Sequence, residues 1–410
     1  MKDENHLKED FEHIAPDAPN QGLENNEEVI AALRSDILSH FEALKLPALN
    51  GNSNGTLSKE AIRASHAFQR REILQREKAA FGNDWADLLQ QFADGVEVCP
   101  EAIEPELIPV VSGEETGYLF RFAALLWSVP VSRGYGRRMR YLVRDRYNGK
   151  LIGIMALGDP VFNLKARDKW IGWDINDRRV RLVHVMDAYV VGAVPPYAQL
   201  LGGKLVASLI GSAEVGDAFS KRYHDNVGII SGEHKAARLT LVTVTSALGR
   251  SSLYNRLKLT EAIDGSEDRR ILVQLQRIGT TQGYGHFQLS NNLFERIRNL
   301  LVSEGHPYAS GYQYGQGPNW RFRVMRVGLE RLGLDQELTR HGIVREVYAM
   351  PLASNFREFL CGEDTEPHLD RPTVSQIAAA ALKRWIIPRS IQRNEYKEFR
   401  RELLLESLSQ

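Results

Sequence analysis

The stretch from Gln199 to Lys204, QLLGGK, has the residue types and spacing of a site for a phosphate-like anion. An apolar, β-type run ends just before it at Pro195-Pro196, and the apolar start of a helix follows. A strand, a turn and a helix in this order aim backbone N–H groups at an anion, because the first N–H groups of a helix lack internal partners and lie at its positive dipole end. In the alternative interpretation, the two glycines only allow the helix to pack closely. The candidate cofactor-binding residues are Gln199, Gly202, Gly203 and Lys204.

A second candidate site combines charged residues with two tryptophans in the segment ARDKWIGWD, residues 166–174. An indole ring can stack on a base or another planar ligand, and a neighbouring guanidinium or carboxylate can anchor its polar groups. We therefore consider Arg167, Asp168 and Trp173 as ligand-binding residues. The alternative is a loop that two buried indoles and an ion pair fix to the sheet.

A third candidate is the stretch YASGYQYGQGPNWRFRVMR, residues 308–326, where aromatic residues alternate with glycines before several arginines. Stacking surfaces next to cations are typical of nucleic-acid binding. On a helix that begins at Pro318, one face could present Trp320, Arg323 and Arg326. The candidate residues for binding DNA or RNA are Trp320, Arg321 and Arg323. The same residues could instead pack a loop against that helix.

The sequence gives no support for a metal site, an NTPase or a serine hydrolase. Its histidines are scattered, and it contains neither a Walker A motif nor a G-x-S-x-G motif. A magnesium site would require Asp159, Asp168 and Asp187 to converge in space. We expect no metal.

Hydrophobic periodicity divides the chain into four parts. An acidic, mobile tail (1–26) precedes a helical region (27–104), whose helices run from about Glu27 to Pro47 and from Ser58 to about Phe81. An α+β core (105–289) should hold strands at about 139–146, 151–157, 182–194 and 239–245 and a helix from Lys204 to about Tyr223. Asn148-Gly149 predicts a two-residue type I′ turn between the first two strands. The remainder (290–410) is mainly helical, with Ser290 as the cap of a helix to about Glu304 and a last helix from about Ser390 to Leu408.

Composition indicates a neutral protein of a reducing compartment. Lysine and arginine together equal aspartate and glutamate at 52 each, so the overall field does not favour nucleic acid or an anionic membrane. Only Cys99 and Cys361 are present, which excludes a disulfide framework. No run of about 18 apolar residues exists to span a membrane. We expect a cytoplasmic protein without a membrane partner.

The core resembles the GNAT acyltransferase fold in the order of its elements. That family binds the pyrophosphate of CoA at a strand-to-helix turn with an Arg/Gln-x-x-Gly-x-Gly/Ala pattern, which Gln199 and Gly202 match and Lys204 does not. The resemblance implies that Tyr254, in SLYNRLKL, protonates a departing thiolate as a general acid. Alternatively, Tyr254 is a packed aromatic residue of a helix.

A longer resemblance covers about residues 132–355. The segments RGYGRRMRYLVRD, GKLIGIMALGDPVFNLKARDKWIGWD, VVGAVPPYAQLLGGKLVAS, SLYNRL, RIGTTQGYG and HGIVREVYAMPLASN occur in the order seen in the DruA proteins of Druantia anti-phage systems. The relatives keep the Arg-Asp-x-x-Ile-Gly-Trp segment and a tyrosine followed by Gly-x-Thr-x-Gly, here Tyr254 with 279–283. The resemblance implies a component of an antiviral defence system with other subunits as partners, and it assigns no catalytic residue.

Two molecular roles follow from these features. In one, the protein is an adapter or sensor that binds nucleic acid or partner subunits through residues 308–326 and the basic C-terminal helices with Lys383, Arg384, Arg389 and Arg393. In the other, it is an enzyme with an acyl-CoA or nucleotide pocket at residues 199–204. The sequence leaves open whether the protein is an enzyme.

Overall fold

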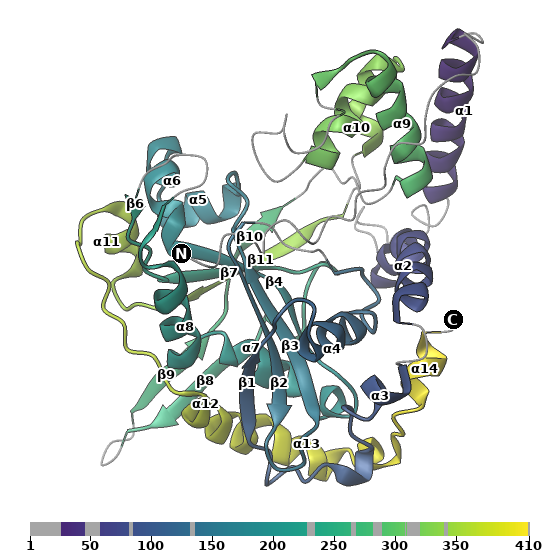
Figure 1. The fold of residues 1–410 in the computed structure, drawn as a ribbon. Helices are drawn as coiled ribbons and strands as arrows, with labels where there is room; N and C mark the ends of the chain where they lie inside the picture. The colour runs from purple at the N-terminus through teal and green to yellow at the C-terminus, as the bar shows by residue number, and fades with distance from the viewer. Residues whose placement is uncertain are drawn as a thin grey trace.

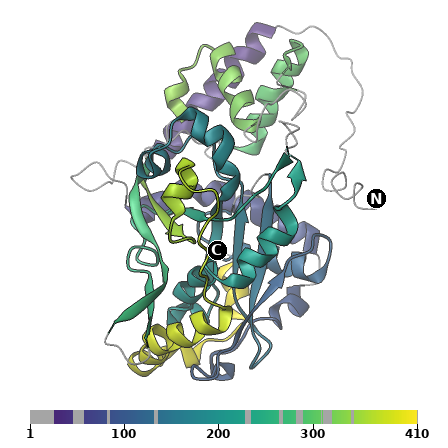
Figure 2. The same cartoon turned by 90° about the vertical axis from the view of Figure 1, so that its left-hand side faces the viewer.

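A computed structural model of the chain describes residues 26–45, 58–81, 85–131, 136–227, 234–263, 268–281, 289–307, 309, 320–339 and 343–408. The expected tail up to residue 25, residues 46–57, and residues 308 and 310–319 of the aromatic stretch therefore lie outside the described residues. Figures 1 and 2 show a layered core with a helical group at one end.

The core is built on a seven-stranded sheet in the order β1-β2-β3-β4-β7-β11-β10. Strands β4 and β7 pair in parallel, and every other neighbouring pair is antiparallel. Two small sheets pair β5 with β6 and β8 with β9. The strands are β1 (Pro105–Pro109), β2 (Arg138–Asp145), β3 (Leu151–Gly158), β4 (Val185–Ala193), β5 (Asn226–Val227), β6 (His234–Lys235), β7 (Leu241–Thr245), β8 (Lys258–Ala262), β9 (Arg269–Gln274), β10 (Gln276–Thr281) and β11 (Arg345–Pro351). The predicted α+β class and mixed sheet are confirmed.

Helices cover both faces of this sheet. One face carries α7, α8 and α12, and the other carries α3, α4 and α14, so that every residue of the central strand β3 is buried. The α-helices are α1 (Asn26–Lys45), α2 (Lys59–Phe81), α3 (Trp85–Leu89), α4 (Glu115–Ala124), α5 (Lys165–Ile171), α6 (Ile175–Arg181), α7 (Gly202–Leu209), α8 (Ala213–Tyr223), α9 (Asn291–Ser303), α10 (Trp320–Arg331), α11 (Phe356–Cys361), α12 (Val374–Ala381), α13 (Ile387–Gln392) and α14 (Leu403–Ser407). Short 3-10 or π turns are η2 (Gly95–Glu97), η3 (Leu182–His184), η4 (Tyr197–Leu200), η6 (Gln336–Thr339), η7 (Leu382–Ile386) and η8 (Glu395–Glu398).

A separate apolar cluster joins α1 to α9 and α10. The first and last thirds of the chain therefore meet in one helical group, at the end of the molecule opposite α12 and α13 in both views (Figures 1 and 2). Side-chain caps mark several helix starts that the sequence predicted: Ser58 accepts the Ala61 N–H at 3.1 Å and Ser290 accepts the Leu293 N–H at 3.2 Å.

Several sequence predictions are wrong in detail. The loop between β2 and β3 has five residues rather than a two-residue turn, because the Asn148 side chain is bonded to the Glu97 carbonyl and the Gly149 N–H to the Asp145 carbonyl. The final third also contributes an interior strand of the sheet, β11, between β7 and β10. Strand β9 pairs with β8, and β10 pairs with β11.

The ends of two predicted helices also differ. The expected helix from Lys204 to Tyr223 is divided into α7 and α8, because Ser212 caps a new helix by accepting the Val215 N–H. The segment from Ser390 to Leu408 consists of short pieces, α13, η8 and α14, rather than one helix.

Candidate functional site

The turn from Gln199 to Lys204 connects η4 to α7 at the end of β4, as the sequence predicted. Leu201, its N-cap residue, has a left-handed φ of 62°. A Cβ atom on Gly202 would lie 2.6 Å from the Tyr197 carbonyl oxygen, and one on Gly203 would lie 3.1 Å from Leu253 Cδ1. Close packing therefore already requires the first glycine and favours the second, with or without a ligand.

The Lys204 side chain extends over the indole of Trp385 in η7, with 5.2 Å from Nζ to the ring centroid. Arg384 lies beside the same ring, with its Cζ 5.8 Å from the centroid. Burial first, and then the positive charges of Arg384 and Arg256, lower the pKa of Lys204. Two arginines from distant parts of the chain thus lie close enough to repel Lys204.

A fourth cation completes this group, which we call the α7 basic cluster: Lys204, Arg256, Arg384 and Arg389. The Arg389 Nε donates to the Gln199 carbonyl oxygen at 3.2 Å, which fixes α13 to the turn. Among the residues that the structure describes, no carboxylate forms an ion pair with any of the four. Arg256 and Arg384 are exposed to solvent.

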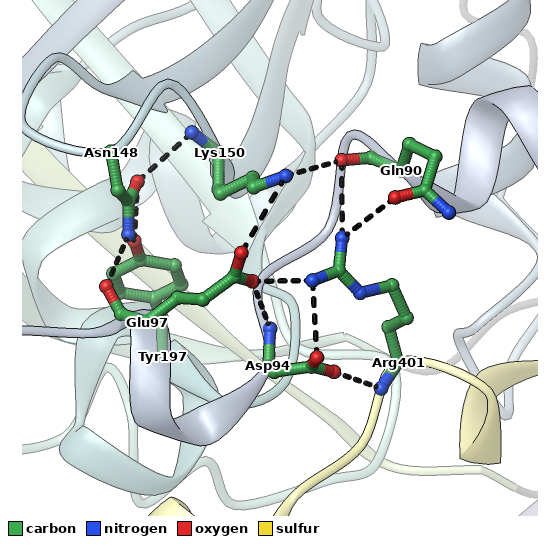
Figure 3. A network of polar contacts seen from close by, with 7 residues as sticks. All are labelled: Gln90, Asp94, Glu97, Asn148, Lys150, Tyr197 and Arg401. Atoms are coloured by element: carbon green, nitrogen blue, oxygen red, sulfur yellow. Dashed lines mark hydrogen bonds and ion pairs between the residues drawn. The ribbon is translucent and has the colours of Figure 1, made fainter.

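The C-terminal segment that supplies two of these arginines is anchored further along by Arg401 (Figure 3). The Arg401 Nη2 donates to Glu97 at 2.6 Å and to Asp94 at 3.1 Å, and its Nη1 donates to the Gln90 side chain at 3.2 Å. The hydrogen bond from the Arg401 side chain lowers the pKa of Asp94. The network holds residues 395–408 against the region around η2.

The same network reaches the turn itself through Tyr197 (Figure 3). Its hydroxyl donates to Asp145 at 2.8 Å and accepts from the Asn148 amide at 2.9 Å. Asp145 is fully buried, and burial raises its pKa. The segment before α7 is therefore fixed at both ends, by Tyr197 to the β2–β3 loop and by Gln199 to α13.

A second polar group lies where the two parallel strands separate. Strands β4 and β7 pair only from Val185 to Asp187 on the β4 side, although β4 continues to Ala193. At this point the Thr243 hydroxyl donates to Asp187 at 2.8 Å. Burial raises the pKa of Asp187 to about 6, against the opposing effects of that bond and of Arg167.

Tyr254 lies near this carboxylate but not on a helix. Residues 251–256 form a turn before β8, so the predicted helix with SLYNRLKL is wrong. The ring of Tyr254 meets that of Tyr348 edge to face, with centroids 5.5 Å apart. Burial and then the charge of Asp187 raise the pKa of Tyr254, which keeps the phenol protonated. A carboxyl group and a phenol in this arrangement could exchange protons with a substrate.

The candidate residues of the ARDKWIGW segment, in and just after α5, form hydrogen bonds within the protein. Arg167 is fully buried and donates to Asp168 and to the carbonyl oxygens of Val161 and Phe162 at 2.7–2.9 Å. Trp173 donates to the Leu360 carbonyl at 2.7 Å. These bonds correspond to the alternative in which the segment is fixed to the sheet, and a contact of Arg167, Asp168 or Trp173 with a ligand stays a prediction.

Trp320, Arg321 and Arg323 lie on α10, in the helical group far from the α7 basic cluster (Figure 1). Trp320 meets Phe294 edge to face at 5.6 Å, and the Arg321 guanidinium lies 4.2 Å from the same ring centroid. Arg321 also donates to the Asn291 side chain at 2.8 Å, and Arg323 is half-buried. These contacts join α10 to α9, and nucleic-acid binding at this helix stays a prediction.

The structure thus brings together residues that the sequence treated separately. Lys204 of the expected cofactor turn meets Arg384 and Arg389 of the expected nucleic-acid helices. Arg256 and Trp385, which complete this arrangement, had no signal in the sequence, because nothing in local spacing shows which distant segments meet. Within the described residues, no three histidine, cysteine, aspartate or glutamate side chains lie close enough to hold a metal ion.

Comparison with known proteins decides the family. Residues 56–362 match the family described as Druantia protein DruA. The chain belongs to the DruA family. It is 45% identical over 385 residues to the Druantia protein DruA of Escherichia coli (strain UMEA 4076-1), and the alignment covers 92% of each chain. No solved structure matches the chain. The DruA match includes Lys204 and Arg256 and ends before the helices that carry Arg384 and Arg389.

Proposed function

We propose that the protein is a component of a Druantia-type anti-phage defence system that binds the phosphate backbone of nucleic acid with its α7 basic cluster. Membership of the DruA family supports the defence role and supports other proteins of the same system as its partners. The observation that carries the molecular role is the meeting of four cations that no described carboxylate neutralises.

Electrostatics favours an anion at this place. Gathering Lys204, Arg256 and Arg384 raises the free energy of the folded protein through mutual repulsion, and a bound phosphate would remove that cost. The chain has a net charge of zero, so the positive charge here is local. The positive dipole end of α7 adds to the same field.

The cluster suits phosphate rather than base recognition. Its aromatic residue, Trp385, is only 7% exposed and lies beneath Lys204, so its ring is not free to stack on a base. Contacts with phosphate position a protein on nucleic acid without reading sequence. We therefore expect binding that depends weakly on sequence and steeply on salt.

The proposal includes a GNAT-like arrangement of the core. A single parallel pair between two antiparallel halves of the sheet, followed by a helix that starts at the glycine turn, supports it. In such a fold the turn before α7 is the expected phosphate site, which is where the cluster lies.

Binding to labelled DNA and RNA, followed by fluorescence anisotropy, tests the proposal. The double variant Arg384→Ala/Arg389→Ala should bind at least tenfold more weakly than the unchanged protein at low salt. Arg63→Ala/Arg146→Ala is the matched control, because it removes the same charge from exposed arginines that pair with Glu60 and Glu104. Equal losses in the two variants, or no binding by the unchanged protein, would overturn the proposal.

A second candidate function is an enzyme that acts at the separation of β4 and β7. The specific observation is the pair formed by Asp187, with its pKa raised to about 6, and the protonated phenol of Tyr254. Its cofactor is unassigned: acyl-CoA and nucleotides both remain candidates for residues 199–204. Leu253, the residue before Tyr254 in the chain, packs against Gly203 of the turn, so the turn and this pair lie close to each other.

Thermal shift against acyl-CoAs and nucleotides separates the two functions. A specific ligand at a hundred times its dissociation constant stabilises the folded protein by about 2.7 kcal/mol. If a ligand and a turnover are found, Tyr254→Phe should abolish turnover and leave ligand binding unchanged. No shift with any of these compounds would remove the enzyme candidate.

A further inference from the structure

Helix α6 is unusual because none of its seven residues is buried. Ile175 is 48% exposed and Val180 is 63% exposed. A helix this short has little stability of its own and normally depends on packing an apolar face. Its apolar residues are instead exposed, on a helix that lies in the group formed by α5, α6 and α11 (Figure 1).

The loop before α5 adds two more exposed apolar residues, Val161 at 46% and Phe162 at 41%. Arg178 of α6 connects the two parts, because its guanidinium lies 5.2 Å from the centroid of the Phe162 ring. Four large apolar side chains from one stretch of twenty residues are therefore exposed, on α6 and on the loop that Arg178 joins to it. Exposed apolar residues on neighbouring elements mark binding surfaces more often than scattered single residues do.

Buried bonds hold this corner in place. The Arg167 guanidinium donates hydrogen bonds to the carbonyl oxygens of both Val161 and Phe162, which fixes the loop. One carboxylate oxygen of Asp168 pairs with Arg167 and the other pairs with Arg178 of α6, each at 2.7 Å. A buried ion pair contributes little net stability, whereas it can fix one geometry. The exposed side chains are therefore presented by a rigid framework and not by a frayed segment.

Three exposed cations of these two helices form no ion pair with any described carboxylate. Asp168 is used by the two arginines, and Asp174 and Asp177 cap the start of α6 by accepting its backbone N–H groups. No carboxylate within the described ranges pairs with Lys165, Lys169 or Arg179, all of which are exposed. We call the apolar residues of the corner together with these cations the α5–α6 surface. It comprises Val161, Phe162, Ile175, Val180, Lys165, Lys169 and Arg179.

We propose that the α5–α6 surface docks a different protein chain that presents apolar side chains flanked by carboxylates, namely another protein of the same defence system. The apolar residues need apolar partners and the cations need acidic ones. Nucleic acid would neutralise the cations but leave the four apolar side chains without matching contacts. A second copy of this chain in a two-fold dimer would place the same cations opposite each other.

This inference gives the ARDKWIGW segment a role that differs from ligand contact. Arg167 and Asp168 are positioning residues, which act on the partner by holding Val161, Phe162 and α6 in place. Trp173 fixes the end of α5 to α11 through the Leu360 carbonyl. The surface lies at the start of β4, away from the α7 basic cluster, so the inference does not rest on the nucleic-acid proposal.

The test uses the full chain and each of the other proteins of its defence system, purified singly, in biolayer interferometry. One of them should bind, and Ile175→Asp/Val180→Asp should weaken that binding at least tenfold, as should Arg179→Glu. Val302→Asp/Ile391→Asp is the matched control, because these side chains are 53% and 78% exposed elsewhere on the molecule. All substituted residues are exposed, so an unchanged melting temperature should accompany each variant.

Several outcomes would overturn the inference. The first is that none of these proteins binds the chain, and the second is that the surface variants bind as tightly as the unchanged chain. The third is that the control variant loses as much affinity as the surface variants. Light scattering that shows a dimer of the chain alone, abolished by Ile175→Asp/Val180→Asp, would assign the surface to a second copy. A loss of DNA affinity in the same variant, without loss of protein binding, would assign it to nucleic acid.

Discussion

The salt dependence of nucleic-acid binding gives the sharpest test of the α7 basic cluster. Each phosphate that a cation neutralises releases counterions, so the logarithm of the association constant falls linearly with the logarithm of the salt concentration. If Lys204, Arg256, Arg384 and Arg389 each neutralise one phosphate of a duplex, the slope should be about −3.6, from about −0.9 per contact. Affinity should then fall about 150-fold between about 50 and 200 mM salt.

Removing two of the four charges changes this slope by a defined amount. Arg384→Ala/Arg389→Ala should have a slope of about −1.8 and lose only about 12-fold over the same range, because two contacts remain. The control Arg63→Ala/Arg146→Ala should keep the slope of the unchanged protein. A general effect of net charge would act equally on both variants, since each loses two positive charges.

The assay is a set of anisotropy titrations with a short labelled duplex at several salt concentrations, repeated for the three proteins. The slope is more informative than a single affinity, because a variant with a local folding defect binds more weakly without losing counterion release. If the slope of the cluster variant equals that of the unchanged protein, these arginines do not contact phosphate and our reasoning about the cluster is wrong.

Three further predictions concern the buried polar groups. Arg167→Met should lower the free energy of unfolding by about 3–5 kcal/mol, because it leaves Asp168 and two carbonyl groups without the arginine that donates to them. Denaturant titration measures this free energy, and a loss below about 1 kcal/mol would contradict the prediction. Asp187 has its pKa raised from 3.8 to about 6, so ionisation costs the folded state stability as pH rises through this window. Asp187→Asn should therefore raise the melting temperature above about pH 6 and not below pH 3.8, and a difference independent of pH would count against the burial of this charge. Arg401→Met should cost about 1.5–3 kcal/mol and speed hydrogen exchange in residues 395–408, whereas unchanged exchange there would show that the apolar contacts of α14 suffice.

The sequence was most informative where structure depends on local spacing. Helices α2 and α9 begin one residue after their predicted caps, Ser58 and Ser290, because a hydroxyl three positions before an N–H can satisfy it in any context. The strands before and after the β2–β3 loop follow from apolar runs that meet next to each other in the chain. In these cases the deciding partner lies within a few residues.

Elements that depend on distant partners were missed. Strand β11 is a run of seven residues that pairs with β7 and β10, about 100 and 70 residues earlier, and no local pattern indicates this. Residues 251–257 have a helical spacing, yet Leu257 is buried in the main core and the chain enters β8 at Lys258. Tertiary burial overrides local propensity there.

The candidate site was predictable only in part for the same reason. The strand, turn and helix at Gln199 to Lys204 were found because they are contiguous. The neighbours that give the turn its charge, Arg384 and Arg389, come from a segment about 180 residues later, and Arg256 comes from an irregular turn. The sequence marked these residues as basic but not as members of one cluster.

Lys204 occupies the position where the acyltransferase pattern expects glycine or alanine, and its surroundings explain what the larger residue does. A small residue would leave the start of α7 open to a pyrophosphate. Lys204 instead lies over Trp385, and its positive charge lies beside that of Arg384. The turn therefore faces the C-terminal helices and is part of a wider cationic surface. This arrangement suits an extended polyanion, which can contact several cations at once, better than a single cofactor enclosed by the fold.

The two proposed surfaces lie at opposite ends of β4, whose nine residues span about 30 Å. The α5–α6 surface precedes the strand at Val185, and the α7 basic cluster follows its end at Ala193. A protein partner at one end therefore leaves the other accessible to nucleic acid, and the two should bind together without competition. If a saturating partner protein displaced DNA from the chain, the surfaces would have to overlap, and the assignment of at least one of them would be wrong.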